Sequence, residues 1–445
     1  MIETTGSRRD AASTIFNLPD FRVIDAADDD GGGRRVLVES VAPPGCPSCG
    51  VVSERVHARR EQAVRDVPVA GPVRVVWAKR RWVCAEARCG RRTFWERSVQ
   101  VPARARSTVR LKDALVAAVI DSGRSARETA GAHGVSWWLV QAAISAVAVL
   151  LPGVDEVPVR RLGIDEHRYR SVRWFREPGG AWRRFEPWMT TFVNLDTGAV
   201  LGVVDGRDSA GVGDWLEVRD PAWRDRVEVV AIDPSAAFRK AITTHLPTAA
   251  VSVDAFHLVQ LANAALTAVR QRCAREQHDR RGRALDPAWA NRRLLLRGAD
   301  TLSERAWARL QNVFAIDDPT RQLEWAWAVK EHVRMLLACT TLDQAGTAMQ
   351  TLHAIAQVAA MPETDRLVAT REAWWPAIEV LIITGITNAK TEAANTSIKN
   401  IKRTGRGFRN ENNYKARILL TSAAKTAART PITKDVFTTN REEPF

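Results

Sequence analysis

The order of strand and helix patterns between residues 157 and 257 is the feature that most limits how this chain can fold. A continuous apolar run, Val227–Ile232, has the composition of a strand that is buried on both faces. Three strand patterns precede this run and one follows it. The predicted strands are Arg161–Tyr169, Met189–Leu195, Val200–Val204, Val227–Ile232 and Ala250–Val253, with helices at Val212–Val218 and Ser235–Thr244. This order predicts three antiparallel strands followed by two that return parallel to the first.

Three acidic residues stand at informative places in this order. A ribonuclease-H-like mixed sheet has the same strand order, and in it Asp165 lies on the central first strand while Asp233 ends the neighbouring fourth strand. Neighbouring strands lie about 4.8 Å apart, so these two carboxylates can approach each other. Glu392 opens a basic helix further along the chain. Three carboxylates of this kind can hold a pair of Mg²⁺ or Mn²⁺ ions, which activate a nucleophile and stabilise the leaving oxygen at a phosphodiester.

The helix that carries Glu392 has a positively charged face. Asn388 is its predicted N-cap and Gly405 its predicted end. Side chains spaced three or four residues apart share one side of a helix. That side holds Glu392, Asn395, Lys399 and Lys402, and the positive track continues through Arg403, Arg406 and Arg409. We expect Asn395 and these cations to contact DNA phosphates near the carboxylates. The alternative is a solvated basic helix with one incidental glutamate.

Four cysteines occur as two pairs near the N-terminus. The first pair is Cys46-Pro-Ser-Cys49 and the second is Cys84-Ala-Glu-Ala-Arg-Cys89, with a glycine directly after each pair and a strand pattern at Val73–Val83 between them. Two thiolate pairs on tight turns are typical of a tetrahedral structural zinc site. Cysteines that fall in turns by chance are the alternative. Cys273 and Cys339 stand alone in helical patterns and are predicted to be buried apolar residues.

The segment that follows the cysteines has the pattern of a helix-turn-helix. Leu111–Ser122 is amphipathic, and a second helix from Ser125 is followed by a glycine turn and a third helix that starts at the N-cap Ser136. An ordinary helical hairpin is the alternative. In a helix-turn-helix the start of the last helix faces DNA. The predicted DNA-binding residues here are Ser136, Trp137, Trp138 and Gln141.

These patterns predict an α/β multidomain protein in which a helical insertion interrupts the mixed sheet core. After Asp254 no strand pattern occurs for more than a hundred residues. The predicted parts are a mobile leader (1–40), a zinc ribbon (41–103), a helix-turn-helix domain (104–152), the first part of the ribonuclease-H-like core (157–257), an all-helical insertion (258–381), the last core helices (382–430) and a tail (431–445).

The charge of the chain favours a polyanionic partner. Lys and Arg total 65 against 51 Asp and Glu, which leaves a net charge of +14. Double-stranded DNA is the commonest partner for such an excess, although a basic protein from an Arg-rich genome has the same composition. Apolar runs are too short to span a membrane, and the N-terminus lacks the apolar core of a signal peptide. We therefore expect a cytoplasmic protein without a membrane partner.

The combination of motifs resembles the DDE-type transposases of bacterial insertion sequences, and most specifically the ISL-three family. The resemblance covers nearly the whole chain from about residue 40, and its last motif is the most specific. It rests on the cysteine pairs, the helix-turn-helix, Gly163-Ile-Asp165-Glu166, Phe192-Val-Asn-Leu-Asp196-Thr-Gly198, Gly206-Arg207, Ile232-Asp233-Pro-Ser, Val253-Asp254-Ala-Phe256-His257, Thr387-Asn388-Ala-Lys-Thr391-Glu392-Ala-Ala-Asn395 and Gly407-Phe408-Arg409-Asn410. It implies cut-and-paste transposition of DNA at the terminal inverted repeats of the element, near the bacterial nucleoid.

The second catalytic carboxylate remains open between two residues. Asp233 follows a strand that should adjoin the first strand, which favours it as a ligand of the catalytic metal. Asp254 begins Asp254-Ala-Phe-His257, which resembles an element that supports the site in related transposases. Asp254 and His257 would then hold the ligands in place. Glu166 should point to the opposite face of its strand and is expected to be structural.

Two other classes of function fit parts of the sequence. One is a catalytically inactive or domesticated DNA-binding protein, which would not need three acidic residues. The other is a non-transposing nuclease such as a resolvase, which would not need the zinc ribbon and helix-turn-helix. Terminal inverted repeats around the reading frame would favour transposition. Because transposition joins two ends, a homodimer or larger assembly on DNA is expected by analogy.

Overall fold

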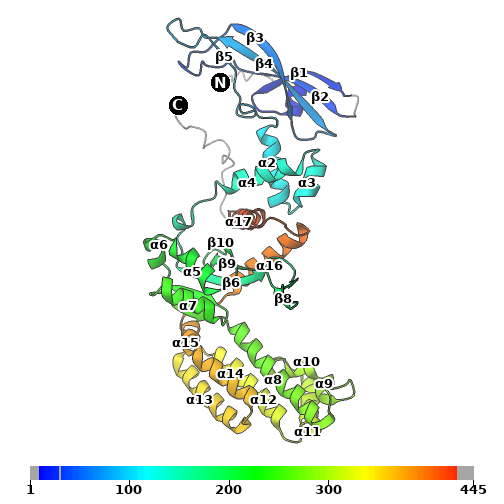
Figure 1. The fold of residues 1–445 in the computed structure, drawn as a ribbon, viewed down its shortest axis with the longest axis vertical. Coiled ribbons are helices and arrows are strands. Elements are labelled where there is room, and N and C mark those ends of the chain that lie inside the picture. The colour runs from blue at the N-terminus through cyan, green and yellow to red at the C-terminus, as the bar shows by residue number, and fades with distance from the viewer. Residues whose placement is uncertain (1–9, 30–31, 428–445) are drawn as a thin grey trace, which may run out of the picture. The chain divides into compact units, whose positions relative to one another are not determined.

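The structure is a computed structural model that describes residues 10–29 and 32–427 (Figure 1). The chain forms two compact units, each of which is described by itself. Unit 1 comprises Met1–Leu151 and Asn400–Phe445, and unit 2 comprises Pro152–Lys399. The boundary between the units falls within helix α16 (Ala389–Thr404). The predicted tail, residues 431–445, lies outside the described residues.

Unit 1 begins with a five-stranded sheet. Its order is β1-β2-β4-β3, with β5 paired to β4. Strands β2 and β4 run parallel, and the other pairs are antiparallel. Trp77 is fully buried and meets the ring of Phe21 edge-on at 5.3 Å. The elements are α1 (Ala11–Phe16), β1 (Phe21–Asp28), β2 (Arg34–Ser40), β3 (Val56–Arg65), β4 (Val73–Val83) and β5 (Thr93–Trp95).

This sheet corrects the prediction of a mobile leader over residues 1–40. Strand β1 pairs along its length with β2, and Phe16, Leu18 and Phe21 are buried in the sheet's core. Polar residues and the Asp-Gly run near residue 30 suggested a leader. Few residues in this part of the chain are apolar, and the side chains that they pack against belong to strands that come later in the sequence. A strand was predicted at Arg35–Ser40, which is β2, but the local composition gave no sign of β1.

Three helices follow the sheet, and the last helix of the chain packs against them. They are α2 (Val109–Ile120), α3 (Ala126–Ala132), α4 (Trp137–Ala148) and α17 (Glu411–Ala427). Ser125 and Glu128 form a capping box at α3, and the Ser136 hydroxyl accepts a hydrogen bond from the backbone at the start of α4. Leu420 of α17 is buried in the core that α2 and α4 form. We call this group the four-helix group.

The position of α17 corrects the predicted part 382–430, which assigned the last helices to the core of the mixed sheet. The buried guanidinium group of Arg417 donates hydrogen bonds to the backbone carbonyls of Gly123 and Arg124 at 3.2 and 2.9 Å. These acceptors lie after the end of α2, where helix carbonyls lack partners. Helix α17 therefore stabilises helices α2–α4 as part of the four-helix group and does not belong to unit 2.

Unit 2 contains a second five-stranded sheet with the order β10-β9-β6-β11-β12. Strand β6 pairs antiparallel with β9 and parallel with β11, and β12 continues the parallel side. This is the strand order that the sequence predicted. The strands are β6 (Arg161–Arg168), β9 (Trp188–Asn194), β10 (Val200–Asp205), β11 (Val229–Ile232) and β12 (Ala250–Val253), and the helices between them are α5 (Ser209–Glu217), α6 (Pro221–Asp225) and α7 (Ala236–His245).

A two-stranded hairpin, which the sequence did not predict, lies between β6 and β9. Its strands are β7 (Arg173–Arg176) and β8 (Trp182–Phe185), and all eight of their residues are exposed. The two strands were missed because all of their side chains are arginine or aromatic, and apolar and polar residues do not alternate along either strand.

Helices alone fill the chain between β12 and α16. Figure 1 shows α8 and the helices α9–α14 gathered beside one another. They are α8 (Ala255–His278), α9 (Pro287–Ala290), α10 (Arg292–Leu295), α11 (Glu304–Asp317), α12 (Gln322–Leu337), α13 (Leu342–Ala359), α14 (Pro362–Ala373) and α15 (Trp375–Thr384). Among the described residues no helix has both the length and the apolar character required to cross a bilayer.

Helix α16 packs closely on strand β6 at Gly163. A Cβ atom at Gly163 would lie 2.0 Å from the Thr391 hydroxyl oxygen and 3.1 Å from the Asn388 amide oxygen. Only glycine leaves room for the helix at this distance. This contact brings the first turns of α16, which contain Glu392, to the strand that contains Asp165.

We predict that Gly163→Ala lowers the free energy of unfolding by about 1–3 kcal/mol, because the added methyl group forces α16 away from β6. Gly346→Ala is the matched control. Gly346 lies inside helix α13 with no atom within 4 Å of an added Cβ, so its replacement should raise stability by up to about 1 kcal/mol. Chemical denaturation of both variants tests the prediction, and equal stabilities would contradict it.

Candidate functional site

The four early cysteines form one cluster in unit 1. Their sulfur atoms all lie within 4.8 Å of one another. The Sγ atoms of Cys46 and Cys89 are 4.0 Å apart, and those of Cys49 and Cys84 are 3.6 Å apart. None of them forms a disulfide, and Trp82 and Phe94 pack beside the cluster. Four thiols at the corners of so small a volume have the donor set and spacing of a tetrahedral zinc site, as the sequence predicted.

The lone cysteines fit their prediction in part. Cys273 is buried in the helical insertion, whereas Cys339 is partly exposed and its thiol donates to the carbonyl of Met335 at 3.4 Å. Neither belongs to a group of potential metal ligands among the residues that the structure describes.

In unit 2 the strand register brings three aspartates to one edge of the sheet. Ile232 of β11 pairs with Ile164 of β6 on one side and with Val253 of β12 on the other. The next residue of each strand is an aspartate, which gives Asp165, Asp233 and Asp254. The backbone N–H of Asp254 also donates to the carbonyl of Ile232 at 2.9 Å. The parallel pairing therefore explains why these acids, which lie far apart in the sequence, meet in space.

His257 lies between two of these aspartates. It belongs to the first turn of α8, which Asp254 caps by accepting a hydrogen bond from the backbone N–H of Phe256. The imidazole Nε2 is 3.0 Å from Asp233 Oδ2, and Nδ1 is 2.9 Å from Asp254 Oδ2. These hydrogen bonds, first to Asp233 and then to Asp254, raise the pKa of His257 to about 10. The ring is therefore a cation at neutral pH and links the two carboxylates.

Asp165 and Glu392 lie beside the group formed by Asp233, Asp254 and His257, and the charges of that group affect their pKa values. Atoms of Asp233, Asp254 and His257 all come within 4.8 Å of one another, and this set includes neither Asp165 nor Glu392. Burial, and next the charge of Asp233, raise the pKa of Asp165 to about 7. Burial, and next the charge of Asp254, raise the pKa of Glu392. Asp165 thus neighbours Asp233, and Glu392 neighbours Asp254.

The donor set fits divalent cations. Two like charges about 4 Å apart repel by about 4 kcal/mol in a partly buried site, and the raised pKa of Asp165 records such repulsion. A hard cation such as Mg²⁺ prefers carboxylate oxygens and would relieve the repulsion. Asp165, Asp233 and Glu392, with Asp254 as the other candidate for the second acid, are the residues that could hold it.

Two asparagines, Asn395 of α16 and Asn388 just before it, hold the carboxylates, and the sequence did not indicate this role. The Asn395 amide donates to Asp165 Oδ2 at 2.6 Å, and its oxygen accepts from the Thr191 hydroxyl at 3.3 Å. The Asn388 amide donates to Asp233 Oδ1 at 3.4 Å. Asn395 is only 2% exposed, which contradicts the prediction that it contacts DNA. Asn395 lies three residues after Glu392 and so on the same side of the helix, and this spacing could have indicated that it faces the carboxylates.

Glu166, predicted to be structural, forms an ion pair. Its carboxylate pairs with Arg207 at 3.6 Å. Burial, followed by the charge of Asp233, raises its pKa.

Five of the predicted DNA-binding residues of unit 1 line one cavity of about 880 Å³. The indole of Trp138 is 76% exposed, and the guanidinium group of Arg406 pairs with Glu128 at 2.7 Å. The cavity lies between the start of α4 and the loop that precedes α17. Its lining includes Trp137, Trp138, Gln141, Arg406, Arg409 and Asn413. The structure therefore joins the two predicted DNA-binding segments that belong to unit 1.

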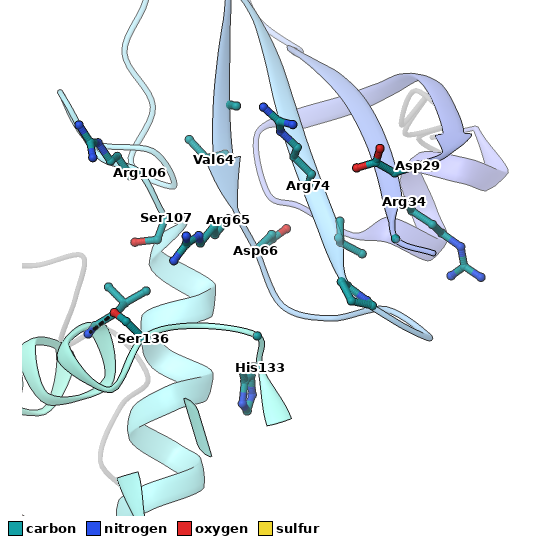
Figure 2. Close-up of a pocket in the computed structure, with 16 residues that line it drawn as sticks. Asp29, Arg34, Val64, Arg65, Asp66, Arg74, Arg106, Ser107, His133 and Ser136 are labelled. Carbon is teal, nitrogen blue, oxygen red and sulfur yellow. Dashed lines mark hydrogen bonds between the residues drawn. The ribbon is translucent and has the colours of Figure 1, made fainter. Parts of the chain in front are cut away.

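Ser136 lines a different cavity, of about 690 Å³, between the sheet of unit 1 and α4. Figure 2 shows its wall of arginines from the sheet and the following loop, with the hydrogen bond that the Ser136 side chain makes to its own helix. Asp66 also lines this cavity, is buried, and accepts hydrogen bonds from the Thr108 hydroxyl and the Arg110 guanidinium group. The basic residues of the wall are Arg34, Arg65, Arg74 and Arg106.

Family comparisons match both units. A family model described as "Transposase", of the DDE type and the ISL3 (ISL-three) group, matches residues 162–418. A second model, "zinc-finger of transposase IS204/IS1001/IS1096/IS1165", matches residues 42–89 and so includes all four clustered cysteines. The first match covers more than half of the chain and contains every acidic residue of the carboxylate cluster.

Individual relatives are more distant. The transposase for insertion sequence element IS1557 of Mycobacterium tuberculosis is 25% identical over 288 residues, which are 60% of this chain and 60% of that protein. The transposase for insertion sequence element IS1001 of Bordetella parapertussis is 25% identical over 62% of this chain and 64% of its own length. The Drosophila P element transposase strand transfer complex has a TM-score of 0.40 and 10% identity, over 73% of this chain and 93% of that one, which is too distant to support any assignment.

We predict one zinc ion per chain, held by the four clustered cysteines. Cys84→Ala with Cys89→Ala should lose the metal and unfold this region locally, because metal binding to such small sites is coupled to folding. Cys339→Ala, at a thiol outside the cluster, should keep it. Metal analysis by mass spectrometry and limited proteolysis test this. Purified wild-type protein without zinc would contradict it.

Proposed function

The chain belongs to the ISL3 family of insertion-sequence transposases, and on that premise we propose that it cleaves and joins DNA at the ends of its own element. The observation that carries this proposal is the acidic cluster at the edge of the unit 2 sheet. Its carboxylates come from β6, β11, the end of β12 and α16. The matched regions of the curated relatives span about 60% of their length, so activity, substrate and partners are inferred for this chain.

In the proposed mechanism Asp165, Asp233 and Glu392 hold Mg²⁺ or Mn²⁺. The bound ions would activate the attacking hydroxyl and stabilise the leaving oxygen of the phosphodiester. Water attacks the phosphorus in the cleavage step, a phosphorus–oxygen bond to the 3′ oxygen breaks, and a 3′ hydroxyl is released. In strand transfer that hydroxyl attacks a phosphodiester of the target DNA, where a second 3′ oxygen leaves.

The chain's own residues keep the carboxylates in position for this chemistry. The Asn395 amide orients Asp165, and the Asn388 amide and His257 orient the two oxygens of Asp233. Asp254 holds the other nitrogen of the histidine ring. Asp233 remains our choice for the second metal ligand because it also influences the pKa of Asp165. Asp254 and His257 are then positioning residues.

DNA recognition is proposed to belong to unit 1. A ribonuclease-H-like core needs a separate reader of sequence, and the start of α4 offers exposed Trp138 and the amide of Gln141 beside arginines. We interpret α2–α4 as a helix-turn-helix whose last helix reads the element ends. The arginine-lined cavity of about 690 Å³ would bind phosphates. Because two ends must be joined, the proposal includes a dimer or larger assembly on DNA.

We predict that Asp165→Asn, Asp233→Asn and Glu392→Gln each abolish strand cleavage while end binding is retained. An amide keeps the shape of the side chain but supplies no charge for the cation. Asp254→Asn should reduce the rate by roughly 10–100-fold, as expected for a residue that orients a ligand. The assay uses a labelled duplex that carries the terminal repeat next to the gene. Normal cleavage by Asp233→Asn, with none by Asp254→Asn, would make Asp254 the ligand.

We predict that specificity and general affinity separate by position. Trp138→Ala with Gln141→Ala should reduce the preference for the terminal repeat over unrelated DNA. Lys399→Gln with Lys402→Gln should weaken binding to both DNAs equally and lower the salt dependence of log Kd by about one per lysine, because phosphate contacts carry no sequence information. Fluorescence anisotropy with the full chain measures both effects. Loss of sequence preference in the lysine variant alone would reverse the assignment.

A further inference from the structure

The hairpin β7–β8 presents aromatic and basic side chains on both faces, close to the acidic cluster. It continues the antiparallel pair β6–β9, in which Arg168 is opposite Trp188. Asp165 precedes Arg168, the last residue of β6, by three residues, so β6 ends about 10 Å along the strand from that carboxylate. Strand β7 begins five residues later, at Arg173. Between Arg168 and Glu186 the chain has six arginines and two glutamates. The hairpin is therefore a positively charged projection next to the proposed catalytic site.

The register of the hairpin sorts its side chains into two different faces. Arg173 is opposite Phe185 and Phe175 is opposite Arg183, which form one face. On that face the two phenylalanine rings meet at 6.1 Å, and Arg183 lies over Phe175 at 5.5 Å and pairs with Glu177 at 3.2 Å. The groups of this face largely satisfy one another.

The other face, which we call the tryptophan face, is made by Trp174, Arg176, Trp182 and Arg184. Trp174 and Trp182 are 57% and 63% exposed. Within residues 32–427 their indoles have no ring partner or hydrogen bond, and Arg176 has no ion pair. The two exposed indoles are diagonal to each other, and each is opposite an arginine. Flat groups can stack on this surface between positive charges.

A series of contacts connects the tryptophan face to the acidic cluster. Arg184 pairs with Glu186, which accepts a hydrogen bond from the Trp188 indole. Arg207 lies over the Trp188 ring at 4.5 Å and pairs with Glu166, the neighbour of Asp165. Arg184, Trp188 and Arg207 line a cavity of about 470 Å³ at the base of the hairpin. A strand that leaves the carboxylates would find cations and rings along this route.

We infer that the tryptophan face binds unpaired nucleotides of the DNA strand that flanks the scissile phosphate. Bases in a duplex are stacked on one another and cannot stack on a protein ring, whereas unpaired bases can. The positive charge favours a nucleic acid over a second copy of this basic chain, whose like charges would repel. This role rests on the proposed function. In it, the hairpin would hold the opened strand while the carboxylates act on the neighbouring phosphodiester bond.

The test measures binding of the full chain without added magnesium, so that it does not depend on cleavage. The probes are a blunt duplex and the same duplex with an unpaired extension of about eight thymidines. Wild type should bind the extended probe more tightly than the blunt one. Trp174→Ala with Trp182→Ala should weaken binding to the extended probe about tenfold and leave the blunt probe unchanged. Trp174→Phe with Trp182→Phe keeps the rings and should retain most of the affinity.

Arginine variants on opposite faces provide the matched control. Arg176→Gln, on the tryptophan face, should weaken binding to the extended probe, and Arg173→Gln, with the same change of charge on the other face, should not. An unchanged ratio between probes in the tryptophan double variant, or equal losses on both probes, would overturn the inference. So would a loss of self-association in that variant by analytical ultracentrifugation without DNA, which would identify a protein interface. Cleavage by wild type is scored separately, so failure of the proposed function is distinguishable.

Discussion

The parallel register of β6, β11 and β12 is the constraint on which the rest of the site depends. It places Asp165, Asp233 and Asp254 at the same level of three neighbouring strands. Such an arrangement is unfavourable by itself, because the carboxylates repel one another in a partly buried position. The fold offsets the repulsion with the cationic ring of His257 and with amide donors from α16. A site that keeps acids together at this cost has the properties expected of a cation-binding site, and it is the basis of the proposed chemistry.

Helix α16 completes the cluster from a distant part of the chain. Its close packing depends on the absence of a side chain at Gly163. The helix carries Glu392 and Asn395 to the cluster, and Asn388 precedes its first residue. The helical insertion α8–α15 lies in sequence between the third aspartate and this helix. The first turn of α8 carries His257, so the helix that opens this stretch also contributes a residue to the cluster.

The chain also returns to its N-terminal unit after α16. Helix α17 fills the core of the four-helix group, and the loop before it brings Arg406 and Arg409 to the cavity beside Trp138. The proposed reader of element ends is therefore built from both ends of the sequence. A fragment that stops near residue 150 would lack Leu420 and Arg417, and with them part of the core of the four-helix group.

Features that depend on local pattern could be predicted from the sequence. Cysteine spacing predicted the thiol cluster, and the apolar runs predicted the strand order and identified the acids that follow them. The family was also recognisable from motifs such as Thr387-Asn388-Ala-Lys-Thr391-Glu392. These signals are local because turns, strands and caps depend on a few neighbouring residues.

Tertiary structure alone decided the rest. It paired β1 with β2 where the composition suggested a leader, and it moved α17 to the α2–α4 group. It turned Asn395 inward to Asp165, although helical spacing had placed it among the DNA-binding cations. It also projected the hairpin β7–β8 with all of its residues exposed. Each of these outcomes depends on which distant surface an element meets, and spacing along one segment carries no information about that surface.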